Sequence, residues 1–115
     1  MKMTERKRSS ALLAEVNPQA MASFNEFRAG VMAPPGVEPV TRETVLAMQL
    51  ALRGYEMPFK IHARRAMALG VSLAQMEGLL LAGVGLSLVP YEAARALEWL
   101  RETHAASQRP EVSPP

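Results

Sequence analysis

The chain of 115 residues contains no cysteine. This absence excludes disulfide bonds, catalysis by a thiolate and metal sites built from cysteine sulfur. Aromatic residues make up only 5% of the sequence, and none of them lies among the basic residues of the segment 1–10. Because single-stranded nucleic acids are bound by stacking bases on aromatic side chains, we expect no nucleic-acid partner.

Long apolar runs are also missing. The longest, "GLLLAGVGLSLVP" at residues 78–90, falls short of the ~20 residues that a membrane-spanning helix needs. The N-terminal residues lack the apolar core of a signal peptide. We therefore expect no membrane partner and a cytoplasmic location.

The residues that are abundant favour helices. Hydrophobic residues make up 49% of the sequence and charged residues 21%, and many of the former are Ala, Leu and Met, which lose little rotamer freedom in a helix. No segment alternates apolar and polar residues with period two. The sequence predicts one all-α domain of about five helices over residues 11–105. A disordered basic tail at residues 1–10 and a disordered polar tail at residues 106–115 flank it.

Capping residues predict where the helices begin. Asn17 precedes a proline and is the expected N-cap of one helix, after a short helical turn at residues 11–16. Thr41 is the expected N-cap of the next helix, and Ser72 with Gln75 forms a capping-box pattern before another. Pro90 is expected at the first turn of the last helix.

Two central helices lie between these signals. The first is apolar nearly all round from Val45 to Leu52, which is typical of a helix buried at the centre of a domain. The second is predicted from about Pro58 to Leu69, with Gly70 as its C-terminal stop. Apolar surface on more than one face is hard to cover within a single small chain. We therefore expect an obligate homo-oligomer.

An ordered set of motifs runs through this region. Thr41-Arg42-Glu43 opens the buried helix and Gly54 ends it, and His62 follows in the next helix. Basic residues, then "ALGV" at residues 68–71, the capped helix and a Val-Pro pair complete the set. With these gaps, residues 20 to 100 resemble the carboxymuconolactone decarboxylase family, which also holds the alkylhydroperoxidase D-like proteins. The resemblance implies the alkylhydroperoxidase D-like helical fold and a homotrimer or homohexamer.

The peroxidase branch of that family carries a Cys-x-x-Cys motif before the downstream histidine. The resemblance puts Tyr55 and Pro58 at its two cysteine positions and Met57 at the place of a second histidine, while Glu43 and His62 keep their family residues. Because the peroxidase reaction needs a thiolate nucleophile, thiol-peroxidase activity is contradicted by this sequence.

The decarboxylase branch carries Gly-x-Glu-His-Glu and the same downstream histidine. The stretch "GYEMPFKIH" keeps Gly54, Glu56 and His62 but has Met57 and Pro58 at the other two positions. Half of the acid/base set implied by the resemblance is therefore missing. The sequence resembles that of an outlying member of the family, in which the pocket has changed.

Four residues are candidates for a catalytic site. His62 can act as general acid or base, since imidazole exchanges protons near neutral pH. Glu43 can orient His62, Glu56 can donate or accept a proton, and the Tyr55 phenol can donate a hydrogen bond to an enolate or carbonyl oxygen.

Each candidate also has a structural interpretation. His62 can be a packed side chain with a satisfied hydrogen bond, and Tyr55 can fill the volume of the lost cysteine pair. Glu43 and Glu56 both lie near helix N-termini, where the helix dipole favours a carboxylate. No pair of histidines has metal-binding spacing, so we expect neither a metal nor another cofactor.

Two functional hypotheses follow. The first is a cofactor-free lyase or isomerase that performs acid/base chemistry on a small carbonyl or lactone compound. The second is a non-catalytic member that binds a small organic molecule or serves as a scaffold.

Overall fold

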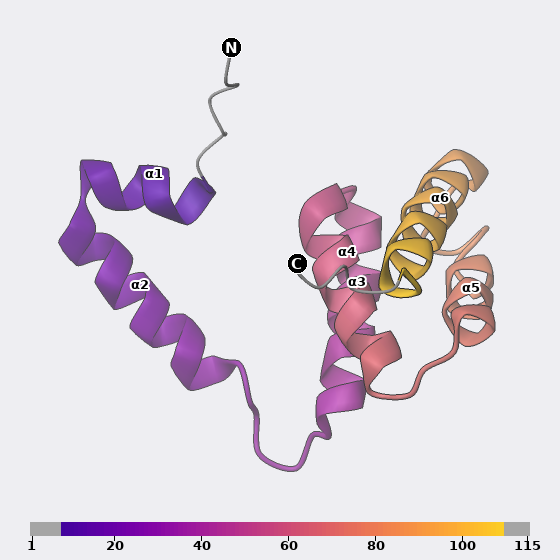
Figure 1. Cartoon of the computed structure of the whole chain (residues 1–115), viewed down its shortest axis with the longest axis horizontal. Coiled ribbons are helices and arrows are strands. Elements are labelled where there is room, and N and C mark those ends of the chain that lie inside the picture. The colour runs from indigo at the N-terminus through magenta and orange to yellow at the C-terminus, as the bar shows by residue number, and fades with distance from the viewer. Residues whose placement is uncertain (1–7, 110–115) are drawn as a thin grey trace, which may run out of the picture. The chain divides into compact units, whose positions relative to one another are not determined.

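The structure, a computed structural model, describes residues 8–109 (Figure 1). Its chain divides into two compact units, Met1–Gly36 and Val37–Pro115. The predicted domain over residues 11–105 therefore spans both units. Most of the predicted basic tail, and residues 110–115 of the predicted C-terminal tail, lie outside the described residues.

Residues 8–109 form six helices and no strand, apart from one isolated bridge between Val84 and Leu88. The all-α prediction is confirmed. The helices are α1 (Ser9–Val16), α2 (Pro18–Val31), α3 (Pro39–Arg53), α4 (Glu56–Ala68), α5 (Leu73–Ala82) and α6 (Pro90–Ser107). In the described part of the chain, no helix is long and apolar enough to cross a membrane.

The first unit is a pair of helices joined at Asn17. The Asn17 side chain accepts a hydrogen bond from the backbone N–H of Ala20 (3.0 Å), and Pro18 occupies the first turn of α2. The predicted N-cap is thus confirmed. Met21 is the one buried residue of α1 and α2, so the pair has almost no core of its own.

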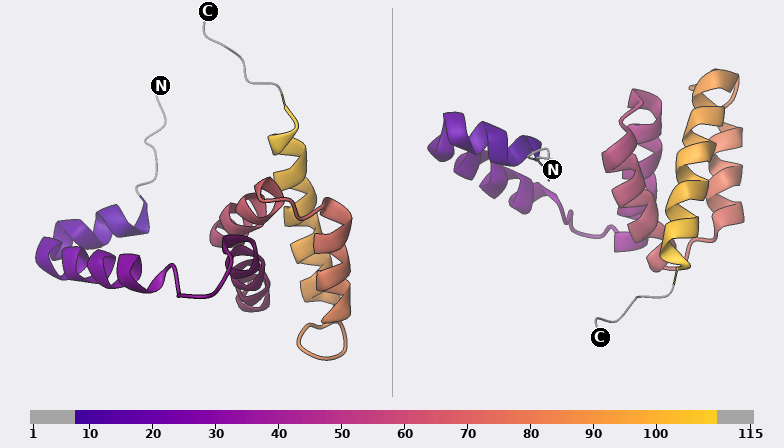
Figure 2. Two further views of the ribbon diagram at one scale, coloured as in Figure 1. Left: turned by 90° about the horizontal axis from the view of Figure 1, so that it is seen from below. Right: turned by 45° about the horizontal axis from the view of Figure 1, so that its top comes forward.

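The second unit packs four helices, with α6 between the α3–α4 pair and α5 (Figures 1 and 2). Its core consists of small and large apolar side chains from all four helices. Its largest fully buried members are Phe59, Met76, Leu80 and Leu100. The rings of Phe59 and Trp99 lie with centroids 6.0 Å apart, which joins α4 to α6.

Two of the predicted helix starts in the second unit are confirmed and one is wrong. Ser72 and Gln75 form both hydrogen bonds of the capping box (2.9 and 3.0 Å), and Pro90 begins α6. Thr41, however, lies inside α3, which begins at Pro39. Proline suits the first helical turn because its missing N–H would have no partner there, so the helix begins three residues earlier than predicted, with Glu38 in place of Thr41 as the N-cap.

The expectation that α3 is buried all round is also wrong for the single chain. Glu43, Ala47 and Ala51 are its buried residues, one turn apart along one face. Val45 and Leu52 on other faces are 48% and 40% exposed. The apolar surplus of this helix therefore lies on the surface of the unit.

The turn between α3 and α4 depends on a glycine. Gly54 has a φ of 71°, a left-handed conformation that side chains with a Cβ rarely adopt. The N–H of Tyr55 donates to the carbonyl of Leu50 (3.2 Å), which closes the end of α3 as in a Schellman motif. This turn returns the chain so that α4 packs along α3.

We predict that Leu80→Ala lowers the free energy of unfolding by about 2–5 kcal/mol, because it leaves a cavity in a fully buried position. The same substitution at Leu86, which is 90% exposed, should change it by less than about 0.5 kcal/mol. Urea denaturation followed by circular dichroism measures both. If the two substitutions lowered the free energy of unfolding equally, Leu80 would not be a core residue.

Candidate acid–base site

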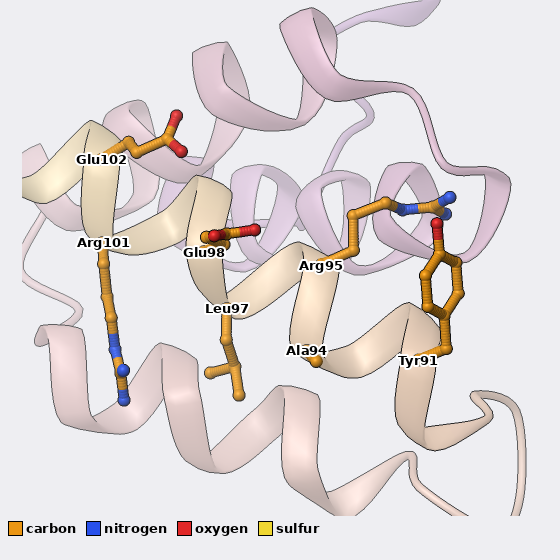
Figure 3. A pocket seen from close by; sticks show the side chains of 7 residues that line it. All are labelled: Tyr91, Ala94, Arg95, Leu97, Glu98, Arg101 and Glu102. Atoms are coloured by element: carbon orange, nitrogen blue, oxygen red, sulfur yellow. The ribbon is translucent and has the colours of Figure 1, made fainter.

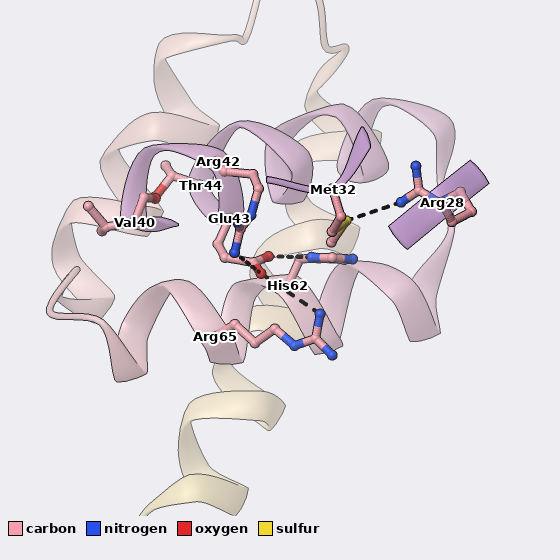
Figure 4. A network of polar contacts seen from close by, with 8 residues as sticks. All are labelled: Arg28, Met32, Val40, Arg42, Glu43, Thr44, His62 and Arg65. Carbon is pink, nitrogen blue, oxygen red and sulfur yellow. Dashed lines mark hydrogen bonds and ion pairs between the residues drawn. The ribbon is translucent and has the colours of Figure 1, made fainter. Parts of the chain in front are cut away.

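The site is built on a carboxylate buried between two helices. Glu43, in the second turn of α3, is 3% exposed, and its Oε2 contacts the Nδ1 of His62 in the middle of α4 (Figure 4). The His62 side chain is 15% exposed. The packing of α3 on α4 therefore joins two residues that are 19 positions apart in the sequence.

The second carboxylate oxygen faces two arginines (Figure 4). Oε1 of Glu43 lies 3.6 Å from Nη2 of Arg42 and 3.8 Å from Nη1 of Arg65. A carboxylate in the protein interior needs such compensation, since leaving water costs it several kcal/mol. The two guanidinium groups and the imidazole together supply it.

The hydrogen bond to Glu43 fixes the role of each imidazole nitrogen. A carboxylate only accepts hydrogen bonds, so Nδ1 of His62 carries the hydrogen that it donates to Oε2. In the neutral ring Nε2 then holds the free lone pair. This arrangement can take up a proton at Nε2 and release it again, which is the elementary step of general acid/base catalysis.

The other two candidate residues have contacts of their own. The phenol oxygen of Tyr55 accepts a hydrogen bond from Nη2 of Arg53 (3.2 Å), and this bond raises the pKa of the Arg53 guanidinium. The Glu56 carboxylate lies 3.0 Å from Nζ of Lys60. Neither contact involves His62, so the structure joins only one pair of the four predicted residues.

Lys60 links α4 to α6. Its Nζ donates to Oε2 of Glu102 at 2.7 Å and also pairs with Glu56, and these two contacts raise its pKa, the one with Glu102 most. Glu56 and Lys60 are four residues apart on one helix, a spacing that sequence alone links to an ion pair. The partner in α6 has no such local signal.

Arg65 is a contact that sequence reasoning missed. It is the residue of α4 whose guanidinium faces the Glu43 carboxylate. The sequence contains a signal for this contact: residues three apart on a helix share a face, and Arg65 follows His62 at that spacing.

Three grooves of the second unit are lined by residues other than this pair. Their lining residues include neither Glu43 nor His62. Within residues 8–109, no three His, Asp or Glu side chains gather closely enough to hold a metal ion. The expectation of a cofactor-free protein stays a prediction.

Comparison with known proteins gives one match. Residues 18–102 match the model of the family described as "Carboxymuconolactone decarboxylase family". No curated protein and no solved structure matches the chain. The matched segment covers both helices of the acid–base pair, Glu43 on α3 and His62 on α4.

We predict that Glu43→Gln lowers the free energy of unfolding by about 3 kcal/mol, because it removes the compensating charge from a buried ion-pair network. The same change at Glu56, whose ion pair with Lys60 is exposed, should cost less than about 1 kcal/mol. Chemical denaturation of the two variants provides the comparison. If Glu43→Gln lowered the free energy of unfolding no more than Glu56→Gln does, the buried ion-pair network would not contribute to stability.

Proposed function

Because the chain belongs to the carboxymuconolactone decarboxylase family, we propose that it is a cofactor-free lyase or isomerase. Its substrate would be a small carbonyl or lactone compound. The observation that carries this proposal is the hydrogen bond from His62 Nδ1 to the buried Glu43 carboxylate. Family membership alone specifies no activity for this chain, so the chemistry is argued from that pair.

In the proposed reaction His62 moves one proton. Its Nε2 takes a proton from the carbon beside a carbonyl group, and the electron pair left on carbon passes to the carbonyl oxygen as an enolate. Return of the proton to another carbon completes an isomerisation. In a decarboxylation, His62 begins with a proton from water on Nε2. Carbon dioxide leaves, the electron pair of the broken C–C bond stays on the substrate carbon, and the imidazolium gives its proton to that carbon.

Glu43 serves as the positioning residue in this scheme. Its carboxylate keeps the hydrogen of the ring on Nδ1 and compensates the positive charge that His62 gains when Nε2 is protonated. Arg42 and Arg65 in turn hold the other oxygen of the carboxylate. Tyr55 and Glu56 stay candidates for assisting the reaction, although their contacts lie with Arg53 and Lys60.

A non-catalytic role is the second candidate. It is favoured by the position of the three grooves of the α3–α6 unit, none of which is lined by His62. In that case the buried pair would stabilise the α3–α4 packing, and the protein would bind a small molecule or act as a scaffold elsewhere.

A measurement of proton exchange on the substrate distinguishes the catalytic from the non-catalytic function. We expect the protein to catalyse incorporation of deuterium from D2O into one or more members of a panel of unsaturated lactones and keto acids, measured by NMR. His62→Ala should lower that rate by about 10²–10⁴-fold, the usual contribution of a general acid or base. Glu43→Gln should lower it less, by about 10–100-fold, as expected when an orienting partner is lost.

His104→Gln is the matched control for the proton-exchange experiment. His104 is the other histidine of the chain and lies in the last turn of α6, so its loss should leave the rate unchanged. Exchange that survives His62→Ala would exclude the proposed role of His62. Binding of a panel compound without exchange would instead support the non-catalytic function.

We further propose that the chain acts as a homo-oligomer. The second unit exposes many large apolar side chains, more than a small monomer usually leaves in water. They are Val37, Val45, Leu52, Tyr55, Met57, Ile61, Leu69, Leu79, Leu81, Val84, Leu86, Val89 and Tyr91. A second copy of the chain is the occupant that an apolar surface of this kind suits, and the resemblance described above implies three or six subunits.

Sedimentation equilibrium tests the assembly. We expect a mass three or six times the 12.6 kDa of one chain, independent of protein concentration in the micromolar range. A mass of one chain under these conditions would exclude a stable oligomer and leave the apolar surface unexplained.

A further inference from the structure

Arg95, on α6, is a partly buried cation without an acidic partner. Its Nε is buried and makes no hydrogen bond, and the ion pairs described within residues 8–109 do not include it. Removing part of a charged group from water without a counter-charge is unfavourable. The position of Arg95 therefore needs an explanation that the acid–base pair on α3 and α4 does not supply.

The residues around Arg95 hold its guanidinium in place but do not neutralise its positive charge. The guanidinium carbon lies 5.0 Å from the centre of the Trp99 ring and 5.6 Å from that of Tyr91, so both rings provide cation–π contacts. On another side it meets the end of α3, where a Cβ built on Gly54 would lie 2.5 Å from Nη2 of Arg95. The carbonyl end of a helix carries only a partial negative charge.

An open groove of about 610 Å³ runs along α6 beside this guanidinium (Figure 3). Ala94 and Leu97 are the apolar aliphatic residues that line it. Arg101 and Glu102 line it too, but each already has an ion pair, with Glu77 at 3.0 Å and Lys60 at 2.7 Å respectively. Arg95 is thus the cation of this groove that is open to a ligand.

We propose that this groove binds a small organic molecule through an oxyanion, carboxylate or phosphate, held by the guanidinium of Arg95. A guanidinium presents two parallel N–H groups that can donate to two oxygens of a carboxylate or of a phosphate. Stacking on aromatic rings keeps these N–H groups oriented. The apolar part of the ligand lies on Ala94 and Leu97. The carboxylate of Glu98 also lines the groove, so a ligand with a single anionic end is favoured over one with two.

The single tryptophan of the chain provides a reporter. Trp99 lies against Arg95, and one indole N–H resonance is expected in a ¹⁵N–¹H correlation spectrum. We expect benzoate, phenyl phosphate or both to shift this resonance in a saturable way, while benzamide, a neutral analogue of benzoate, does not. A response to only one of the two anions identifies which oxyanion the groove takes.

Variants at Arg95 and at an arginine outside the groove make the test specific. Arg95→Lys keeps the positive charge but loses the paired N–H groups of the guanidinium, and should weaken binding at least about tenfold. Arg64→Lys should leave the affinity within about twofold, because Arg64 lies on α4 and does not line this groove. Circular dichroism shows that each variant is folded, and Arg95→Met serves as a second variant at position 95.

Three results would overturn the proposal. They are the absence of a saturable shift with either anion, an equal response to benzamide, and unchanged affinity in the Arg95 variants. The result of this binding test does not depend on whether His62 catalyses proton exchange, because neither Glu43 nor His62 lines this groove.

Discussion

The packing of α3 on α4, the pair that carries the proposed site, depends on the buried carboxylate of Glu43. A charged group that is 3% exposed requires neighbours that offset its lost hydration, and here they come from the same helix and from the next one along the chain. The observed packing of α3 on α4 adds His62 and Arg65 to the compensation that Arg42 gives from within α3. The same packing holds the Nδ1 of His62 against the carboxylate.

Small side chains make this register sterically accessible. Ala47 and Ala51 on α3, and Ala63 and Ala66 on α4, are all buried at about one-turn spacing. The separation of two packed helices depends on the side chains at the contact, so alanines allow the backbones to approach closely. Bulkier residues at these positions would separate the helices and lengthen the contact between Glu43 and His62. The packing and the proposed site are consequently one structural feature.

Local signals in the sequence predicted most helix boundaries but not what each helix buries. Asn17, Ser72 and Pro90 were identified correctly because capping depends on neighbours within a few residues. The burial of α3 was overestimated, since its apolar residues encircle the helix while a single chain covers only one face. The contact between Glu43 and His62 was expected from a family resemblance. Helical spacing alone cannot place residues of two helices together, and for the same reason the partner of Lys60 on α6, Glu102, was not predicted.

The contact between Glu43 and His62 does not depend on the residues that the resemblance puts at the sulfur positions of the peroxidase branch. Tyr55 precedes α4 and its phenol oxygen is engaged by Arg53. Pro58 lies in the first turn of α4, where its missing N–H leaves no hydrogen bond unmade. Neither substitution disturbs the later turn of α4 that carries His62. The carboxylate–imidazole pair is therefore present in a chain that has no cysteine, because neither of its two contacting atoms depends on a thiol.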